Sequence, residues 1–307
     1  NTAALEGLKK QGTSLVITVD TGITAAEETE YARSLGMDLV ITDHHECHTD
    51  LPRAAAVVNP HRPDCPYPFK ELAGVGVVFK LISAMEETRT GESRLQVAVR
   101  MFASYADLVA IGTIADVMPV CGENRIIIRQ GLAMIEENTR TGIRALMDAA
   151  GGKNDKRRHT KITSGYIGYT LAPRINAAGR LLSATIAVEL FLTEDYRTAY
   201  AVAEKLCRAN KDRQAEENKI IKEAAEKIKT YASAEKYPVI VLDADTWHHG
   251  VIGIVSSRIT EKYCRPSILV SFEGSVGDRP SPDDIGKGSG RSVRGLNLVD
   301  ALCYCSD

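Results

Sequence analysis

Two short runs of apolar, mostly β-branched residues stand near the start of the chain, at 14–20 and 38–43. Neither run alternates apolar with polar positions, which is the pattern of strands that are buried on both faces of a parallel sheet. Between the runs, Thr24 and Glu27 have the spacing of a capping box, and Gly36 is suited to the end of a helix. This part of the chain therefore predicts a β-α-β unit.

The middle of the chain changes from strand-like to helix-like patterning. A further strand is predicted over 55–59, where Pro60 ends it, and three prolines mark 61–69 as a loop. Two helices are predicted over about 72–87 and 95–115, with a turn-rich joint between them. Residues 151–161 are polar and basic and predict a loop. We interpret its charges as solvated, with guidance of DNA as the alternative.

The β-α-β pattern returns late in the chain, after a long polar stretch. Residues 197–232 are rich in Ala, Glu and Lys without Gly or Pro, which predicts one long helix or a broken pair. The elements that follow are a strand over 239–243, a helix over 250–263, a strand over 267–272, a loop over 274–290 and a strand near 289–293. We therefore predict an α/β protein. A parallel-sheet domain (1–196) is joined by a connector helix (197–234) to a smaller α/β domain (235–307).

Composition narrows the class of protein without naming a function. The 307 residues are 44% hydrophobic and 25% charged, as in soluble globular proteins, and no apolar run approaches the ~20 residues of a membrane span. The net charge of -2 argues against a surface coated with positive charge for duplex binding. Seven scattered cysteines without a CxxC pair, and no visible signal peptide, predict reduced thiols in the cytoplasm.

Acidic and histidine side chains stand where the first two predicted strands end. Asp20 ends one strand, and Asp43, His44 and His45 end the other. Because parallel strands present their carboxyl ends at one edge of the sheet, these side chains are expected to converge there. Carboxylates with an imidazole suit Mn²⁺ or Mg²⁺, with Zn²⁺ or Co²⁺ as alternatives, and a metal pair ~3.5–4 Å apart would activate water. The competing interpretations are helix-capping aspartates and surface histidines.

Three segments resemble motifs of the DHH phosphoesterase family: Val19–Gly22 (VDTG), Thr42–His45 (TDHH) and Gly112–Asp116 (GTIAD). The resemblance implies that Asp20, His44 and Asp116 are ligands of Mn²⁺ or Mg²⁺. It also implies that His45 contacts the scissile phosphate and that Asp43 supports it, the two forming the catalytic pair. Asp107 precedes Asp116 on the same predicted helix, and we interpret it as a helix-surface acid.

Four further segments are similar to the RecJ-type nucleases of that family: 72–79, 172–180, 249–258 and 288–292. The resemblance implies a 5′-to-3′ exonuclease on single-stranded DNA in repair and recombination, with a helicase or single-strand-binding protein as partner. The implied substrate-binding residues are Arg174, Asn176, Arg180, His249, Arg258, Ser289 and Arg291. Ion pairs between the domains remain the alternative role for Arg174 and Arg258.

The chain also departs from the family pattern. No aspartate-rich first motif precedes Asp20, and the glycine- and histidine-rich segment and the OB-type domain are missing at the other end. These departures predict a fragment with an incomplete metal site.

Three alternatives stay open. A phosphodiesterase of short oligonucleotides or cyclic dinucleotides is disfavoured by the 197–232 connector and by segment 172–180. A non-catalytic nucleic-acid-binding scaffold is disfavoured by the intact Asp43–His45 and Asp116. A zinc site is the third, formed by Cys47, His48, His61 and Cys65. Its spacing is not that of a zinc knuckle.

Overall fold

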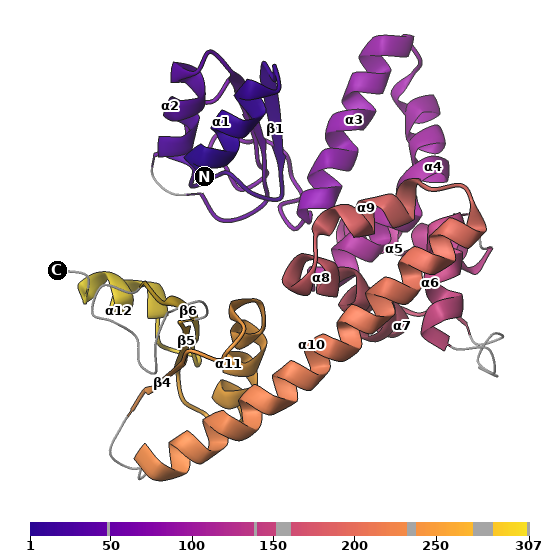
Figure 1. Ribbon diagram of the computed structural model, residues 1–307. Coiled ribbons are helices and arrows are strands. Elements are labelled where there is room, and N and C mark those ends of the chain that lie inside the picture. Colours follow the sequence, from indigo (N-terminus) through magenta and orange to yellow (C-terminus); the bar gives the residue numbers. More distant parts are fainter. Residues whose placement is uncertain (48–49, 138–139, 152–160, 232–237, 273–284, 306–307) are drawn as a thin grey trace. The chain divides into compact units, whose positions relative to one another are not determined.

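The computed structural model describes residues 1–47, 50–137, 140–151, 161–231, 238–272 and 285–305. These residues form two compact units, one of Asn1–Pro173 with Thr193–Tyr200 and the other of Arg174–Leu192 with Ala201–Asp307 (Figure 1). His48, most of the predicted basic loop (152–160) and most of the predicted 274–290 loop lie outside the described residues. The predicted division at 196 and 234 stays a prediction, since it concerns domains rather than these compact units.

The first unit begins with a three-stranded parallel sheet, as predicted. Its strands β1 (Leu15–Val19), β2 (Asp38–Thr42) and β3 (Ala56–Val58) lie in the order β1-β2-β3. Helices α1 (Thr2–Lys10) and α2 (Ala26–Ser34) supply apolar side chains to the core beside it. The buried members of that core are Leu5, Ala32, Met37, Leu39 and Ile41. The central strand β2 is therefore the buried one.

Two local predictions for this sheet were wrong. Strand β1 is not buried on both faces, because it is an edge strand of the described sheet and leaves Leu15, Ile17 and Val19 about half exposed. The capping box of Thr24 and Glu27 does not form, because α2 begins only at Ala26, where no side chain caps it. Gly36, with φ +67°, does follow the helix end as expected.

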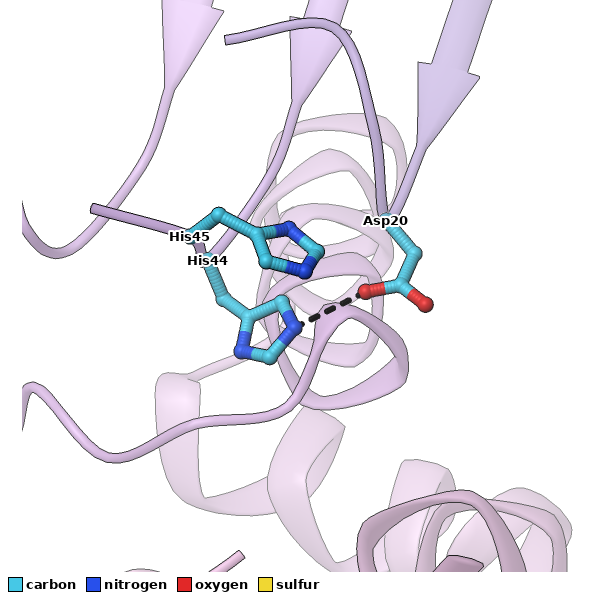
Figure 2. Close-up of side chains that lie close together, drawn as sticks. All are labelled: Asp20, His44 and His45. Atoms are coloured by element: carbon cyan, nitrogen blue, oxygen red, sulfur yellow. Dashed lines mark ion pairs between the residues drawn. The ribbon is translucent and has the colours of Figure 1, made fainter. Parts of the chain in front are cut away.

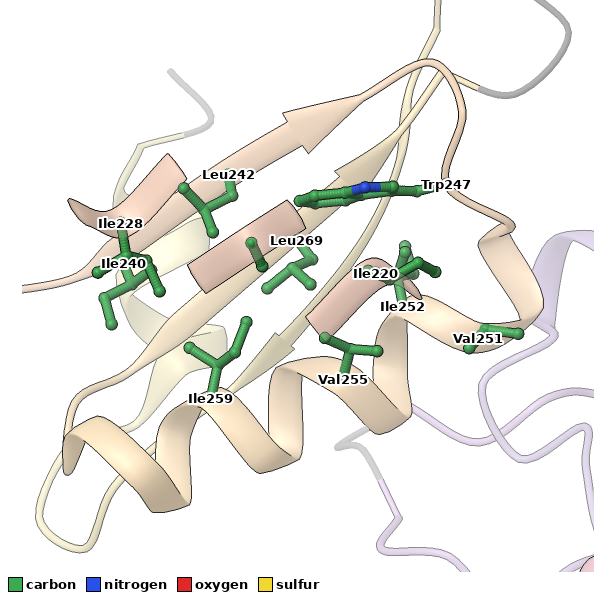
Figure 3. Packing of buried hydrophobic residues seen from close by; sticks show 11 residues of the cluster. Ile220, Ile228, Ile240, Leu242, Trp247, Val251, Ile252, Val255, Ile259 and Leu269 are labelled. Carbon is green, nitrogen blue, oxygen red and sulfur yellow. The ribbon is translucent and has the colours of Figure 1, made fainter. Parts of the chain in front are cut away.

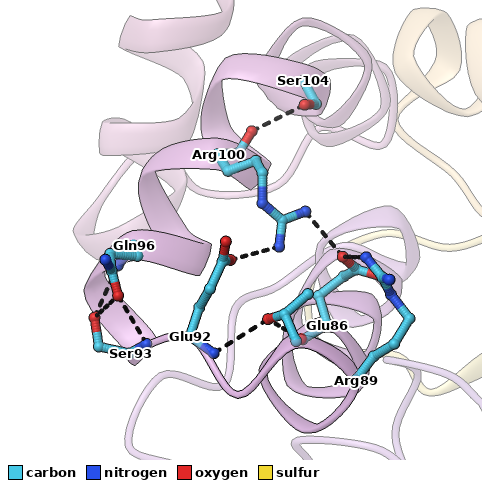
Figure 4. Close-up of polar contacts among 8 residues, drawn as sticks. Glu86, Arg89, Glu92, Ser93, Gln96, Arg100 and Ser104 are labelled. Atoms are coloured by element: carbon cyan, nitrogen blue, oxygen red, sulfur yellow. Dashed lines mark hydrogen bonds and ion pairs between the residues drawn. The ribbon is translucent and has the colours of Figure 1, made fainter.

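A helical region follows, and the sequence had predicted its first two helices. Helices α3 (Gly74–Thr90) and α4 (Arg94–Ala115) are joined at Gly91, whose φ of +68° favours glycine. Ser93 and Gln96 form a capping box at the start of α4. Across the joint, Arg100 pairs with both Glu86 and Glu92 (Figure 4). The turn between the two helices is thus held by backbone conformation and by side-chain charge.

Further elements of the first unit were not predicted. They are α5 (Gly122–Glu136), α6 (Thr141–Gly151), α7 (Ser164–Tyr166) and the π-helical segment η2 (Ile167–Leu171). Their packing corrects the interpretation of Asp107, which is 1% exposed and forms an ion pair with Arg140 at 2.7 Å. Asp107 is therefore a buried acid of the helix core and not a surface residue.

Helix α4 is also the one described helix whose length and composition would allow it to cross a membrane, a test that core helices of soluble proteins pass as well. It buries Val97, Met101 and Val109 in a cluster with Phe79 of α3 and Ile127 of α5. Packing in the protein core therefore accounts for these three apolar side chains of α4.

The second unit has a three-stranded sheet of its own, with helices before and after it. Helices α8 (Ala172–Leu181) and α9 (Ala184–Leu192) precede α10 (Tyr196–Tyr231), so the predicted connector is one unbroken helix of 36 residues. Strand β4 (Ile240–Ala244) pairs parallel with β5 (Ser267–Ser271), which pairs antiparallel with β6 (Lys287–Arg291). Helix α11 (His249–Tyr263) connects β4 to β5, and α12 (Leu298–Tyr304) follows β6.

The core of the second unit is formed by one face of α10, by α11 and by the sheet (Figure 3). Ile220 and Ile228 of α10 meet Leu242 of β4 and Leu269 of β5 there. Trp247 is fully buried in the same cluster, and its indole N–H donates a hydrogen bond to Glu223 Oε2 at 2.8 Å. One face of the long helix therefore forms part of this core.

Candidate metal centre and basic cavity

The ends of β1 and β2 bring the predicted metal ligands together. The register pairs Val19 with Thr42, and the backbone N–H of Asp20 donates to the carbonyl of Thr42 at 3.0 Å. His44 Nε2 then lies 2.9 Å from Asp20 Oδ1 (Figure 2) and 3.3 Å from Asp116 Oδ2. Asp20, His44 and His45 present ligand atoms within 4.8 Å of one another.

Asp43 is directed at the protein and not at the opening of this site. One of its oxygens accepts the backbone N–H of Ile23 at 2.9 Å, and the other accepts that of His44 at 2.8 Å. Burial alone raises the pKa of the Asp43 carboxyl, but hydrogen bonds from His45 and from the backbone outweigh burial and lower this pKa. Asp43 thus stays ionised and fixes the strand-end loop.

His45 projects outward from the same loop. Its Nδ1 lies 2.7 Å from Asp43 Oδ1, while 60% of its side chain is exposed. The hydrogen bond to Asp43 raises the pKa of His45, and burial only partly offsets it. An exposed imidazole that holds its proton more tightly is suited to bind a phosphate oxygen or to donate a proton.

The donor set fits a divalent cation. His44 Nε2 is buried and has no hydrogen-bond partner among the described residues, although two carboxylate oxygens lie within 3.3 Å of it. Burial raises the pKa of Asp116, His44 opposes this shift, and the negative charge of Asp20 adds to it. A cation bound by Asp20, His44 and Asp116 would satisfy the ring nitrogen and offset the clustered negative charge. Two oxygens and one nitrogen are ligands that Mn²⁺ accepts, and Mg²⁺ binds through such carboxylates.

Backbone conformation at the site was missed by the sequence analysis. Asp20 itself has a φ of +62°, and Val117, directly after Asp116, has a φ of +58°. A β-branched residue rarely adopts this conformation. At the start of α3, a Cβ on Gly74 would lie 2.4 Å from Asp20 Oδ1, so only glycine fits there. Gly74 falls in segment 72–79, whose resemblance was the one available signal for it.

Three of the predicted substrate-binding residues meet in the second unit. Arg180, Arg258 and Arg291 line a cavity of about 530 Å³, together with Gly253, Ile254, Ser257 and Glu261. Arg180 donates to the carbonyl of Gly250 at 2.9 Å, and Arg291 donates to Ser257 Oγ at 3.0 Å. Burial lowers the pKa of Arg180, and the positive charges of Arg213 and Arg291 lower it further. The cavity is therefore a place of unbalanced positive charge.

The other predicted substrate-binding residues do not line this cavity. Arg174 and Asn176 lie on α8, and Ser289 lies on β6, with its Oγ 3.3 Å from Arg291 Nη1. His249 is the first residue of α11 and stacks on His248, whose Nδ1 accepts the backbone N–H of Gly250 at 3.0 Å. The first turn of α11 is thus capped by a side chain.

Arg258 does form an ion pair, as its alternative role predicted, although its partner lies in the same compact unit. Arg258 Nε lies 2.6 Å from Glu217 Oε1 on α10, and the sequence analysis had not singled out Glu217. The described residues do not support the zinc alternative, because Cys47, His61 and Cys65 form no group among them that could hold a metal ion. His61 instead pairs with Glu46 at 3.2 Å.

Comparison with known proteins places these features in a family context. Residues 2–113 match the model of the DHH family, N-terminal domain. The single-stranded-DNA-specific exonuclease RecJ of Bacillus subtilis is 39% identical over all of this chain, which covers 36% of that protein. RecJ of Escherichia coli is 38% identical over 95% of this chain and 49% of its own length. The chain therefore spans half or less of the length of these relatives.

Solved structures agree with the sequence relatives. RecJ from Thermus thermophilus in complex with Mn²⁺ is 34% identical, with a TM-score of 0.78 over 100% of this chain and 42% of that one. A structure of exonuclease RecJ bound to manganese has a TM-score of 0.74 at 34% identity and covers 98% of this chain and 68% of that one. The Thermus thermophilus protein has also been solved with Mg²⁺, with a TM-score of 0.67 at 32% identity over 100% of this chain and 46% of that one.

Proposed function

The chain belongs to the RecJ branch of the DHH family, and on this basis we propose that it serves metal-dependent 5′-to-3′ exonucleolytic hydrolysis of single-stranded DNA. The observation that carries the proposal is the buried, unsatisfied Nε2 of His44 between the carboxylates of Asp20 and Asp116. This arrangement supports a hydrolase with a bound cation, because a buried imidazole nitrogen without a hydrogen bond is costly, and a cation held with the two more exposed carboxylates would satisfy it.

Mn²⁺ or Mg²⁺ is the proposed cofactor, held by Asp20, His44 and Asp116. Bound metal supplies Lewis-acid polarisation of the phosphate and a more acidic water. The remaining proposed roles belong to side chains beside the metal ligands. His45 binds a phosphate oxygen or donates its proton, and Asp43 keeps the imidazole of His45 in position through the 2.7 Å contact.

The proposed substrate fits the charges of the second unit. Arg180, Arg258 and Arg291 around one cavity suit successive backbone phosphates, which carry no sequence information. Arg174, Asn176, His249 and Ser289 are kept as proposed substrate contacts, since the resemblance implies them. A role in repair and recombination, a cytoplasmic location and a helicase or single-strand-binding partner belong to the same proposal.

The proposal is tested by substrate preference. The protein, in a form that includes the aspartate-rich first motif of the family, is incubated with Mn²⁺ or Mg²⁺ and with 5′-labelled single strands, duplexes or dinucleotides of one sequence. We expect release of 5′ mononucleotides from single strands, little action on duplexes and no preference for dinucleotides.

The matched variant is His45→Ala, which removes the exposed imidazole and leaves the three proposed metal ligands unchanged. It is expected to lower the rate by about 10²–10⁴-fold, the usual contribution of a general acid. A preference of the unaltered protein for dinucleotides would instead favour the short-oligonucleotide phosphodiesterase.

A further inference from the structure

We propose that Glu217 is a positioning residue that holds the guanidinium of Arg258 at the basic cavity of the second unit, where Arg258 binds a backbone phosphate of single-stranded DNA. This inference rests on the proposed function for the identity of its ligand. It adds a residue that neither the sequence motifs nor the comparisons point to.

The contacts of Glu217 divide between two arginines. Its Oε2 lies 2.7 Å from Arg213 Nη1 on the same helix, and its Oε1 lies 2.6 Å from Arg258 Nε on α11. Only 3% of the Glu217 side chain is exposed, against 60% of the Arg258 side chain. The buried carboxylate therefore joins one nearly buried arginine to one that faces solvent.

Arg213 is fixed by its own helix. Its Nε and Nη2 both donate to Asn210 Oδ1, at 3.2 and 3.1 Å, while Nη1 bonds to Glu217. The three side chains form a buried network whose charges cancel, since Arg213 and Glu217 carry one charge of each sign. Glu217 is thus held in place before any ligand arrives.

The cavity itself keeps a positive charge. Three arginines and one glutamate line it, so its formal charge is 3 − 1 = +2. Because Arg213 balances Glu217, the ion pair to Glu217 orients Arg258 without removing that excess charge. An anion is the ligand that such a cavity attracts.

Glu217 contacts Arg258 at Nε, and this determines which guanidinium nitrogens can bind a phosphate. The carboxylate oxygen Oε1 lies beside Nε as an ion pair at 2.6 Å, without a hydrogen bond among the described residues, and no hydrogen bond among them involves the two terminal nitrogens of Arg258. Nearby, Arg291 is oriented by Ser257 in the same way, through its own Nε at 3.0 Å. Arg258 therefore keeps both terminal nitrogens for a phosphate, which accepts such paired donors well. Arg291 keeps only Nη2, because its Nη1 donates to the carbonyl of Gly290 at 2.7 Å.

The experiment measures binding of a fluorescein-labelled single-stranded oligonucleotide by fluorescence anisotropy at several salt concentrations. Glu217→Gln keeps the shape and removes the charge, and we expect Kd to rise about 10-fold. The slope of log K against log salt should fall by about 0.7, the value for one phosphate contact to a single strand. Arg258→Ala should give a similar loss.

The double variant Glu217→Gln/Arg258→Ala separates positioning from a merely structural role. If Glu217 acts through Arg258, the double variant binds no more weakly than Arg258→Ala alone. If the increase in Kd of the double variant equals the product of the two single increases, Glu217 acts independently of Arg258 and the inference is overturned.

Arg258→Lys covers the case in which Glu217→Gln fails to fold. This exposed position keeps its charge but loses the Nε contact, so it is expected to weaken binding almost as much as Arg258→Ala. Arg208→Lys, at an exposed position of α10 outside the cavity, is the control and should change nothing. If Arg258→Lys leaves Kd unchanged, the positive charge alone suffices and Glu217 has no positioning role.

The outcomes also separate this inference from the proposed function. An unaltered protein that does not prefer single strands to duplex overturns the proposed function and the inference with it. Normal binding of single strands by both the unaltered protein and Glu217→Gln overturns the positioning role alone.

Discussion

The metal centre and the basic cavity are held together in opposite ways. At the metal centre, Asp20 and His44 follow strand ends, Asp116 follows helix α4, and backbone N–H groups fix the supporting Asp43. At the cavity, the arginines come from α8, α11 and β6, and a buried side-chain ion pair on α10 holds one of them. The geometry of the metal centre therefore depends on the backbone at its ligands, whereas the position of Arg258 at the cavity depends on a charge pair between side chains of distant elements.

The largest effect is expected at the buried pair. Arg213→Met leaves Glu217 buried beside only an exposed partner, which should lower the free energy of unfolding by about 3–5 kcal/mol. Urea denaturation followed by circular dichroism measures the loss. Arg208→Met, on an exposed face of the same helix, is the matched control and should stay within about 0.5 kcal/mol. Equal stability of the two variants would contradict a dependence on the buried pair.

The next effect concerns the metal centre. His44→Ala removes the only nitrogen ligand of the proposed set and should weaken Mn²⁺ binding by about 100-fold or more, since even indirect partners contribute 10–100-fold. Isothermal titration calorimetry gives the affinity and the number of sites. His61→Ala is the control, because His61 lies outside the proposed ligand set and pairs with exposed Glu46. Unchanged Mn²⁺ stoichiometry in His44→Ala would show the ligand assignment to be wrong.

A smaller effect tests whether backbone geometry supports the metal ligands. Gly74→Ala would place a Cβ 2.4 Å from Asp20 Oδ1, so Asp20 must move, and Mn²⁺ affinity should fall by about 10-fold. The same titration measures this shift. Gly7→Ala adds a methyl group on α1 where nothing lies within 4 Å, and it should leave the affinity unchanged. If both variants bind Mn²⁺ equally, close packing against Asp20 is not required.

The smallest effect lies away from both sites, at an exposed charge network (Figure 4). Arg89 and then Arg100 lower the pKa of Glu86 from 4.5 to about 2. A lowered carboxyl pKa stabilises the folded state above pH 4.5, and this contribution is lost as the pH falls through about 2. Glu86→Gln should therefore be slightly less stable than the parent at pH 7, with a gap that closes between pH 4.5 and 2. Urea denaturation over that range checks it, and a gap independent of pH would exclude the ionic contribution.

The sequence predicted what depends on local order along the chain. The strand ends that carry Asp20 and Asp43 follow from hydrophobic runs, and the rule for parallel sheets brings them to one edge. Asp116 was predicted only from the resemblance of its motif. It follows a helix, and the pattern along the chain does not say that the end of this helix lies beside the sheet. Composition predicted either one long helix or a broken pair over 197–232, and neither the choice between them nor the role of the helix in a core was predicted.

What the sequence did not predict depends on contacts between distant elements. The pairing of Glu217 with Arg258 joins two helices whose spacing along the chain carries no signal. Asp107 was misjudged because its burial depends on Arg140 and on helices that had not been predicted. Strand β1 was taken as buried because an apolar run does not say whether a strand lies at an edge.

The burial of Trp247 has a spectroscopic consequence. It is the only tryptophan in the sequence, and its ring lies in the core that α10 shares with the second sheet. Its fluorescence therefore reports the unfolding of the second unit, whereas far-ultraviolet circular dichroism reports the helices of both units. Two transitions that fail to coincide would show that the units unfold separately. The chain thus contains its own optical probe for the unit that holds the basic cavity.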